Sequence, residues 1–142
     1  MRLEVSRRSD LAVRTLRVLA ERADKLKGHE LADAVGSTAG FVPQVLAPLV
    51  KAGWVRSDPG PTGGYLLVAD LRRVSVLAVI EAVEGPTDTG RCVLADRPCA
   101  EQGTCALHAP WLKARAQLLR SLSSTTVASA SLFDGAVAGD RP

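Results

Sequence analysis

The fold is decided by residues 29–68, which read HELADAVGSTAGFVPQVLAPLVKAGWVRSDPGPTGGYLLV. Apolar residues at helical spacing predict a short helix over residues 29–35, and Gly36 is suited to ending it in the left-handed conformation. The same spacing predicts a second helix over residues 38–52, in which Pro48 is expected to cause a kink because proline has no amide proton. Two helices joined by a tight glycine turn are typical of a helix-turn-helix.

A β-hairpin and an earlier helix extend this unit on both sides. The runs 54–56 and 65–68 are rich in strand-forming residues, and the segment between them is dense in proline and glycine, which predicts a hairpin with an extended loop. The apolar residues within 9–23 recur at a spacing that places them on one face of a helix. We therefore expect a helix there, with Ser9 or Asp10 as its N-cap. The order predicts a mostly α fold with a small β-hairpin wing, namely a winged helix-turn-helix.

The second half of the chain predicts two more helices around a loop. A regular apolar stripe indicates a helix over residues 76–83, and a broader one indicates a helix over residues 109–122 that either packs on its own domain or, as we favour, on a second subunit. Residues 125–133 are expected to add a last turn or two. We therefore divide the chain into a winged helix-turn-helix domain at 1–85, a cysteine-rich loop at 86–108, a dimerisation helix and C-terminal turn at 109–133, and a flexible tail at 134–142.

Composition and charge narrow the class of function. The 142 residues are 46% hydrophobic and 23% charged, which excludes wholesale disorder, and no apolar run is long enough to cross a membrane. Without a secretory signal, the chain is expected to be cytoplasmic. Nucleotide-binding glycine motifs and the G-x-S-x-G motif of serine hydrolases are absent, so an enzyme is not expected. The net charge of +3 lies entirely within residues 1–60, on the side of the helix-turn-helix.

This placement of positive charge suits either a solvated helix face or a surface that binds a polyanion. The order of the elements adds a geometric reason for DNA, because the second helix of such a motif can enter the major groove of the double helix. Gln44 is suited to pairing with an adenine edge, and Ser37 or Thr38 to contacting a phosphate or a base. The candidate DNA-binding residues are Arg2, Arg7, Arg8, Ser37, Thr38, Ala39, Gln44, Lys51, Arg56, Thr62 and Gly63. For each of them the alternative is a solvated surface residue.

All three cysteines of the chain, Cys92, Cys99 and Cys105, lie in the expected loop. An odd number of clustered thiols argues against a disulfide framework and favours a soft metal centre, either zinc or an iron–sulfur cluster. His108 follows Cys105 at a spacing that suits a zinc site with three cysteine ligands and one histidine ligand. Direct sensing through the thiols is a further alternative.

Several motifs in this order resemble the bacterial winged-helix transcription regulators that include IscR, NsrR and RirA. They are the start Met1-Arg2-Leu3, the run Ser9-Asp10-Leu11-Ala12-Val13-Arg14, the segment Phe41-Val42-Pro43-Gln44-Val45-Leu46, the segment Leu49-Val50-Lys51-Ala52-Gly53-Trp54-Val55, the wing end Gly63-Gly64-Tyr65-Leu66-Leu67 and the clustered cysteines. The resemblance covers residues 1 to about 122. It implies a homodimer that binds a palindromic operator.

The resemblance also implies the cofactor and its ligands. Cys92, Cys99 and Cys105 would hold a 4Fe–4S or 2Fe–2S cluster, with Asp10 of the partner subunit or His108 of the same chain as fourth ligand. The state of the cluster would switch operator affinity in response to nitric oxide, redox state or cluster supply. One extra residue between the first two cysteines departs from the usual spacing of the family.

A second departure concerns the wing. Family members usually carry an arginine near the wing tip, suited to the minor groove, whereas this chain has Pro59-Gly60-Pro61-Thr62 there and Arg56 at the base. We therefore expect a weaker wing contact. Arg7, Arg8, Arg14 and Arg56 are then expected to supply more of the affinity for phosphates.

Overall fold

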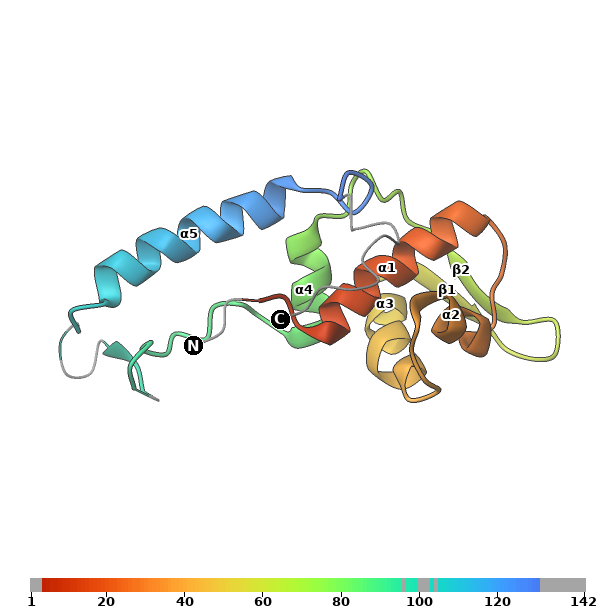
Figure 1. Ribbon diagram of the computed structural model, residues 1–142, viewed down its shortest axis with the longest axis horizontal. Coiled ribbons are helices and arrows are strands. Elements are labelled where there is room, and N and C mark those ends of the chain that lie inside the picture. The colour runs from red at the N-terminus through yellow and green to blue at the C-terminus, as the bar shows by residue number, and fades with distance from the viewer. Residues whose placement is uncertain (1–3, 96, 100–102, 104, 131–142) are drawn as a thin grey trace, which may run out of the picture.

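The computed structural model describes residues 4–95, 97–99, 103 and 105–130. Helices dominate the described part, and its one sheet is a two-stranded antiparallel hairpin (Figure 1). In chain order the elements are α1 (Arg7–Arg22), α2 (Gly28–Val35), η1 (Val42–Leu46), α3 (Ala47–Lys51), β1 (Val55–Asp58), β2 (Gly64–Leu67), α4 (Val76–Glu84) and α5 (His108–Ser124). The predicted mostly α fold with a hairpin wing is therefore confirmed.

Helix α1 begins earlier than the apolar pattern indicates. Its N-cap is Ser6, whose Oγ accepts the backbone N–H of Ser9 at 3.2 Å, so the expected caps Ser9 and Asp10 are wrong. Ser9 is fully buried in the first turn, and its hydroxyl donates to the carboxylate of Glu84 at 2.7 Å. The cap was missed because it lies before two arginines, outside the stretch in which apolar spacing is visible.

The predicted kink near Pro48 takes the form of a wide turn. The expected helix over residues 38–52 is replaced by a turn at residues 38–40, a π-helical segment η1 and the short helix α3. The amide of Ala47 bonds to the carbonyl of Val42, five residues back. Pro48 has no amide proton and would crowd the carbonyl four residues earlier, so a π-turn immediately before it accommodates the ring. We call η1 and α3 together the reading helix.

The wing requires glycine at two positions, one in its turn and one where β2 meets the segment before α2. The strands pair from Val55 with Leu67 to Asp58 with Gly64. A Cβ on Gly63 would lie 2.1 Å from the carbonyl oxygen of Asp58, and one on Gly64 would lie 2.8 Å from that of Leu26. Leu26 also exchanges two backbone hydrogen bonds with Tyr65, so the segment before α2 pairs with the outer edge of β2.

One hydrophobic core holds α1, the helix-turn-helix and α4 together. Leu16, Leu31, Leu46 and Leu49 are fully buried, and Val79 of α4 belongs to the same cluster. We call this part of the molecule, α1 to α4 with the wing, the head.

The chain then leaves the head and comes back to it. Residues 85–124, which we call the distal arm, comprise the cysteine loop and α5, and they extend away from the wing (Figure 1). After α5 the chain makes a β-bridge between Thr126 and Ser75, and Val127 is buried in the head. We expected residues 125–133 to add a last turn or two of helix, but up to residue 130 they form a β-bridge followed by a turn. Residues 131–133 and the predicted tail at 134–142 lie outside the described residues.

No helix among the described residues is both long enough and apolar enough to span a membrane.

Candidate metal centre and nucleic-acid interface

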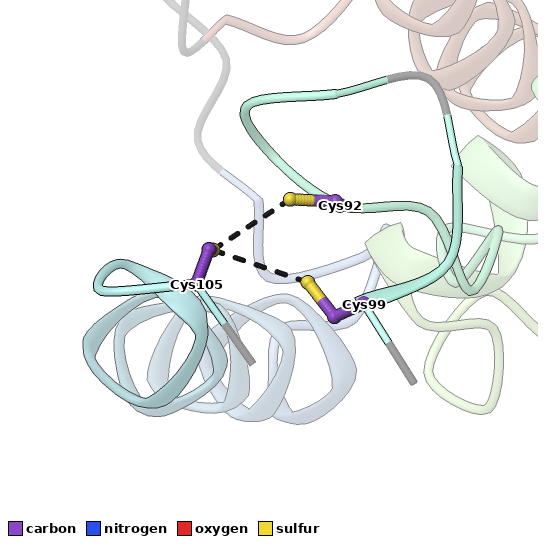
Figure 2. Close-up of side chains that lie close together, drawn as sticks. All are labelled: Cys92, Cys99 and Cys105. Carbon is purple, nitrogen blue, oxygen red and sulfur yellow. Dashed lines mark hydrogen bonds between the residues drawn. The ribbon is translucent and has the colours of Figure 1, made fainter. Parts of the chain in front are cut away.

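Three thiols converge at the far end of the distal arm. The sulfur of Cys105 lies 3.6 Å from that of Cys92 and 3.9 Å from that of Cys99 (Figure 2). The three sulfur atoms all lie within 4.8 Å of one another, and each side chain is half-buried. Among the described residues, this is the group of histidine, cysteine and acidic side chains that could hold a metal ion.

Loop backbone and the start of α5 position these thiols. The amide of Cys92 donates to the carbonyl of Arg97 at 2.9 Å, which folds the loop back on itself. The carbonyl of Cys105 accepts the amide of His108 at 3.1 Å, so Cys105 lies in the turn that leads into α5. One thiol is therefore attached to the helix, while Cys99 and Cys92 approach it from the loop (Figure 2).

The thiols differ in acidity. The pKa of Cys92 is lowered to about 7, chiefly because the backbone N–H of Leu94 bonds to its sulfur, at 3.4 Å, and further because of the neighbouring Cys99. The pKa of Cys99 is raised, above all by its proximity to Cys92. Cys92 is thus converted more easily than Cys99 to the thiolate that binds metals and reacts with electrophiles.

The donor set fits a soft metal centre. Three thiolates are suited to zinc or to iron–sulfur clusters and not to hard cations. A tetrahedral ion with metal–sulfur bonds of about 2.3 Å separates its sulfur ligands by roughly 3.8 Å, close to the two sulfur–sulfur distances above. The cysteines also line a cavity of about 300 Å³. Arg115 also lines this cavity. Its Nη2 atom is buried and has no hydrogen-bond partner within the described residues.

Neither of the two expected fourth ligands is part of the candidate metal-binding group, which consists of the three cysteines. His108 lines the same cavity as these cysteines but does not belong to the group. Asp10 lies on α1, where its carboxylate pairs with Arg14 at 3.0 Å. Asp10 as a ligand from a partner subunit therefore stays a prediction, and so does His108.

The residues predicted to contact DNA bases lie together at the helix-turn-helix. Thr38 and Ala39 are exposed in the turn before the reading helix, whereas Ser37 is half-buried. Gln44 and Lys51 are exposed on the reading helix itself. This arrangement leaves the polar side chains available to a groove while Val45 and Leu49 pack into the core.

The positive charges at the base of the wing are paired with a carboxylate. Arg56 pairs with Asp58 at 3.1 Å, and Lys25, from the segment before α2, pairs with the same carboxylate at 2.7 Å. These contacts lower the pKa of Asp58, with Lys25 the larger cause and Arg56 the second. Thr62 is exposed near the wing tip, whereas Gly63 is buried and its amide donates to the carbonyl of Gly60 at 3.0 Å. Gly63 therefore closes the turn and offers DNA little surface.

The remaining predicted contacts lie at the start of α1. Arg7 and Arg8 are exposed in its first turn, and Arg2 lies outside the described residues. The positive charge of Arg8 helps to lower the pKa of Glu84, although the hydroxyl of Ser6 is the main cause.

Three charged residues near these sites were not found from the sequence: Asp58, Glu84 and Arg115. Each acts through a partner in another segment: Asp58 bonds Lys25, Glu84 bonds Ser9, and Arg115 bonds Asp88 at 3.2 Å. The only local signal was the alternation of Arg56 and Asp58 in one strand, which places both side chains on the same face.

Comparisons with known proteins agree with this geometry. The Rrf2 family, described as iron-dependent transcriptional regulators, matches residues 5–131. The transcriptional regulator IscR of Yersinia pseudotuberculosis serotype O:1b is 31% identical over 99 residues, which are 70% of this chain and 60% of that protein. IscR of Xenorhabdus nematophila is 35% identical over 82 residues, which are 58% of this chain and 49% of that protein. The match thus spans about half to three fifths of these relatives' length.

Solved structures give the same fold. IscR of T. potens superposes with a TM-score of 0.65 at 26% identity, covering 89% of this chain and 85% of that one. The global cysteine regulator CymR of B. subtilis superposes with a TM-score of 0.69 at 24% identity, covering 90% of this chain and 95% of that one, and this likeness concerns the fold alone. Together with the match over residues 5–131, these findings show that the chain belongs to the Rrf2 family of transcriptional regulators, as the resemblance to IscR, NsrR and RirA predicts.

Proposed function

We propose that this protein is a dimeric transcription regulator that binds double-stranded DNA with its head and is switched by an iron–sulfur cluster in its distal arm. The observation that carries the proposal is the convergence of three thiols within 4.8 Å in a chain of the Rrf2 family. The loop that carries the thiols lies at the opposite end of the described chain from the wing (Figure 1), so the proposed input and output are separate.

The DNA-binding surface consists of the reading helix, the turn before it and the first turn of α1. The exposed side chains of Gln44 and Lys51 support this proposal, in which Gln44 would recognise a base edge and Lys51 would contact a phosphate. At the wing, Arg56 must exchange its bond with Asp58 for one with a phosphate. We therefore expect the reading helix and α1 to supply most of the affinity and the wing to supply less.

Cys92, Cys99 and Cys105 would hold the cluster, with Asp10 of the partner subunit or His108 as the fourth ligand. When bound, the cluster supplies a centre whose charge and ligation change on reaction with nitric oxide or with oxidants. A carboxylate or imidazole ligand would leave one iron more exchangeable than four thiolates would, which suits a sensor.

A contact between α4 and the start of α1 lies directly before the cysteine loop. Glu84 is the last residue of α4 and immediately precedes the loop. Its carboxylate accepts hydrogen bonds from Ser6, the N-cap of α1, and from Ser9 in the first turn of α1. A change in the loop that moves Glu84 would therefore act on the first turn of α1. This contact supports coupling between the two ends of the chain.

The outer face of α5 supports a homodimer. Leu112 and Leu118 are 47% and 51% exposed, and no residue of α5 is buried in the single chain. A second copy packed on α5 would bury these side chains and bring two heads into a twofold arrangement. Such a dimer reads two half-sites of a palindromic operator.

The test compares metal-free and anaerobically reconstituted protein on one duplex selected from a random-sequence pool. We expect brown protein that contains iron and sulfide, and a DNA dissociation constant that differs between the two forms. Equal dissociation constants would contradict the switch. Reconstituted protein without iron would contradict the cluster.

The sulfur spacing favours one second candidate, a zinc site in the same winged-helix regulator, formed by the three thiolates alone or together with His108. Sulfur–sulfur distances of 3.6 and 3.9 Å suit ligands of a single tetrahedral ion. Thiolates distributed over different iron atoms would lie further apart. Colourless protein with one zinc per chain, purified without chelators, would establish this alternative.

A further inference from the structure

The side chain of Arg115 connects the two segments that carry the cysteines. It lies on α5, seven residues after His108, and is only 21% exposed. Its Nη1 lies 3.2 Å from Oδ1 of Asp88, and the same oxygen accepts the backbone N–H of Gly90 at 2.9 Å. Asp88 precedes Cys92 by four residues, whereas Cys105 leads into α5. The ion pair therefore ties the entrance of the loop to the helix that follows Cys105.

The second terminal nitrogen of Arg115 has a different position. Nη2 is buried and has no hydrogen-bond partner within the described residues, and Arg115 lines the cavity that the three cysteines also line. A buried cationic N–H without an acceptor is costly, and an anionic group in the cavity would relieve this cost. Three thiolates around a core of charge +2, whether a zinc ion or an oxidised cluster, carry a net charge of −1. Such a centre would give Nη2 an anionic group to face, in addition to the carboxylate of Asp88 that pairs with Nη1.

We propose that Arg115 positions and charge-balances the cysteine centre: one guanidinium nitrogen holds the loop through Asp88, and the other presents a buried positive charge to the thiolates. The inference rests on the proposed metal centre and adds to it a residue that is not a ligand. It separates two contributions, the tie to Asp88 and the charge in the cavity.

Three variants separate these contributions. Arg115→Gln removes both, Arg115→Lys keeps the positive charge, and Asp88→Asn removes the tie but leaves the positive charge of Arg115 in place. Each is reconstituted anaerobically with ferrous iron and sulfide, and the rate of iron loss to a chelator is followed. We expect Arg115→Gln to lose iron about 10- to 100-fold faster than the wild type, the range typical of residues that support metal ligands. Arg115→Lys is expected to recover part of this loss.

The midpoint potential of the bound cluster tests whether Arg115 acts through its positive charge or only as a structural tie. Reduction adds negative charge, so loss of the arginine should lower the potential, whereas Arg115→Lys should stay near the wild type. Asp88→Asn removes a negative charge and should not lower it. A purely structural tie predicts the same direction for Arg115→Gln and Asp88→Asn, and that result would overturn the charge-balancing role.

Hydrogen exchange of residues 87–92 in the metal-free protein tests the tie independently of any cluster. Both Arg115→Gln and Asp88→Asn should accelerate exchange there, with unchanged exchange in α1 as proof that the head is folded. Wild-type rates of iron loss and exchange in Arg115→Gln would overturn the inference while leaving the proposed function intact. A wild-type protein that takes up no metal on reconstitution would instead contradict the proposed function, and the charge-balancing role with it.

Discussion

In the head, Leu16, Leu46 and Leu49 are fully buried, whereas α5 in the distal arm has no buried residue. The head derives its shape from a hydrophobic core, which forms within a single chain. The arm is held by polar contacts such as the Arg115–Asp88 pair, by the approach of three thiols and by its attachment to α4. The difference shows that the core of the head is closed by residues of this chain, including Val127 after α5, whereas α5 buries none of its own residues. Under the proposed function the arm would receive a metal centre at one end and a second chain along α5.

The largest expected effect is on the arm alone. Cys105→Ser removes the thiol that lies 3.6 and 3.9 Å from the other two, and we expect it to abolish metal binding. Iron, sulfide and zinc content measure this directly. The far-ultraviolet circular dichroism spectrum should change little, because the helices of the head do not depend on the thiols. Loss of most helical signal would show that head and arm fold as one unit.

The second prediction concerns the core of the head. Leu46→Ala would leave a cavity at a fully buried position. We expect a loss of about 2.7–5 kcal/mol in the free energy of unfolding, independent of protein concentration. The matched control is Leu118→Ala on the exposed face of α5. If α5 pairs with a second copy, the control should lower stability mainly in dilute protein. Urea titrations at two protein concentrations test both, and equal losses at both positions would remove the contrast between the regions.

The third variant is expected to strengthen DNA binding. Asp58→Asn releases Lys25 and Arg56 from their shared carboxylate. Since both cations then become available to phosphates, we expect tighter binding to DNA of any sequence and a salt dependence steeper by about one for each new phosphate contact. Fluorescence anisotropy at several salt concentrations measures this slope.

The control for this variant is Asp70→Asn, which makes the same charge change at a carboxylate paired with Arg72 outside the wing. The control should leave the slope near the wild-type value. Arg56→Ala should lower the slope by about one if Arg56 neutralises a phosphate. Identical slopes for Asp58→Asn and Asp70→Asn would show that the wing does not approach DNA.

The smallest expected effect lies at the junction of head and arm. The hydroxyl of Ser6, and to a smaller extent that of Ser9, lowers the pKa of Glu84 below its ordinary value. A carboxyl whose pKa falls on folding stabilises the folded state above its unfolded pKa, about 4.3, and this contribution is lost as pH falls through the lowered value. The difference in unfolding free energy between wild type and Glu84→Gln should therefore be complete near neutral pH and disappear in acid.

Thermal unfolding across this pH range measures the difference. Glu21→Gln, which makes the same substitution at the other end of α1, serves as the control. A difference for Glu84→Gln that persists below the lowered pKa would contradict the role assigned to the charge.

The head could be predicted from the sequence because its signals are local. Gly36 ends α2 at a positive φ of 70°, and Leu31 and Val35 are buried as their spacing predicts. The convergence of the three cysteines was likewise foreseeable from their proximity in the chain. The Lys25–Asp58 and Ser9–Glu84 contacts could not be predicted, since each joins segments whose distance is determined only by the packed core. The cap at Ser6 was missed because a hydroxyl outside the apolar pattern leaves no periodic signal.

The return of the chain after α5 has a consequence for how the protein is made. Val127 completes the core of the head, and its amide bonds to the carbonyl of Val74 at 2.8 Å. The distal arm is therefore an insertion between two parts of one folding unit. On the ribosome, the head can finish folding only after the entire arm has emerged. A minimal DNA-binding fragment should accordingly replace residues 85–124 with a short linker, because cutting the chain after α4 would discard part of the core.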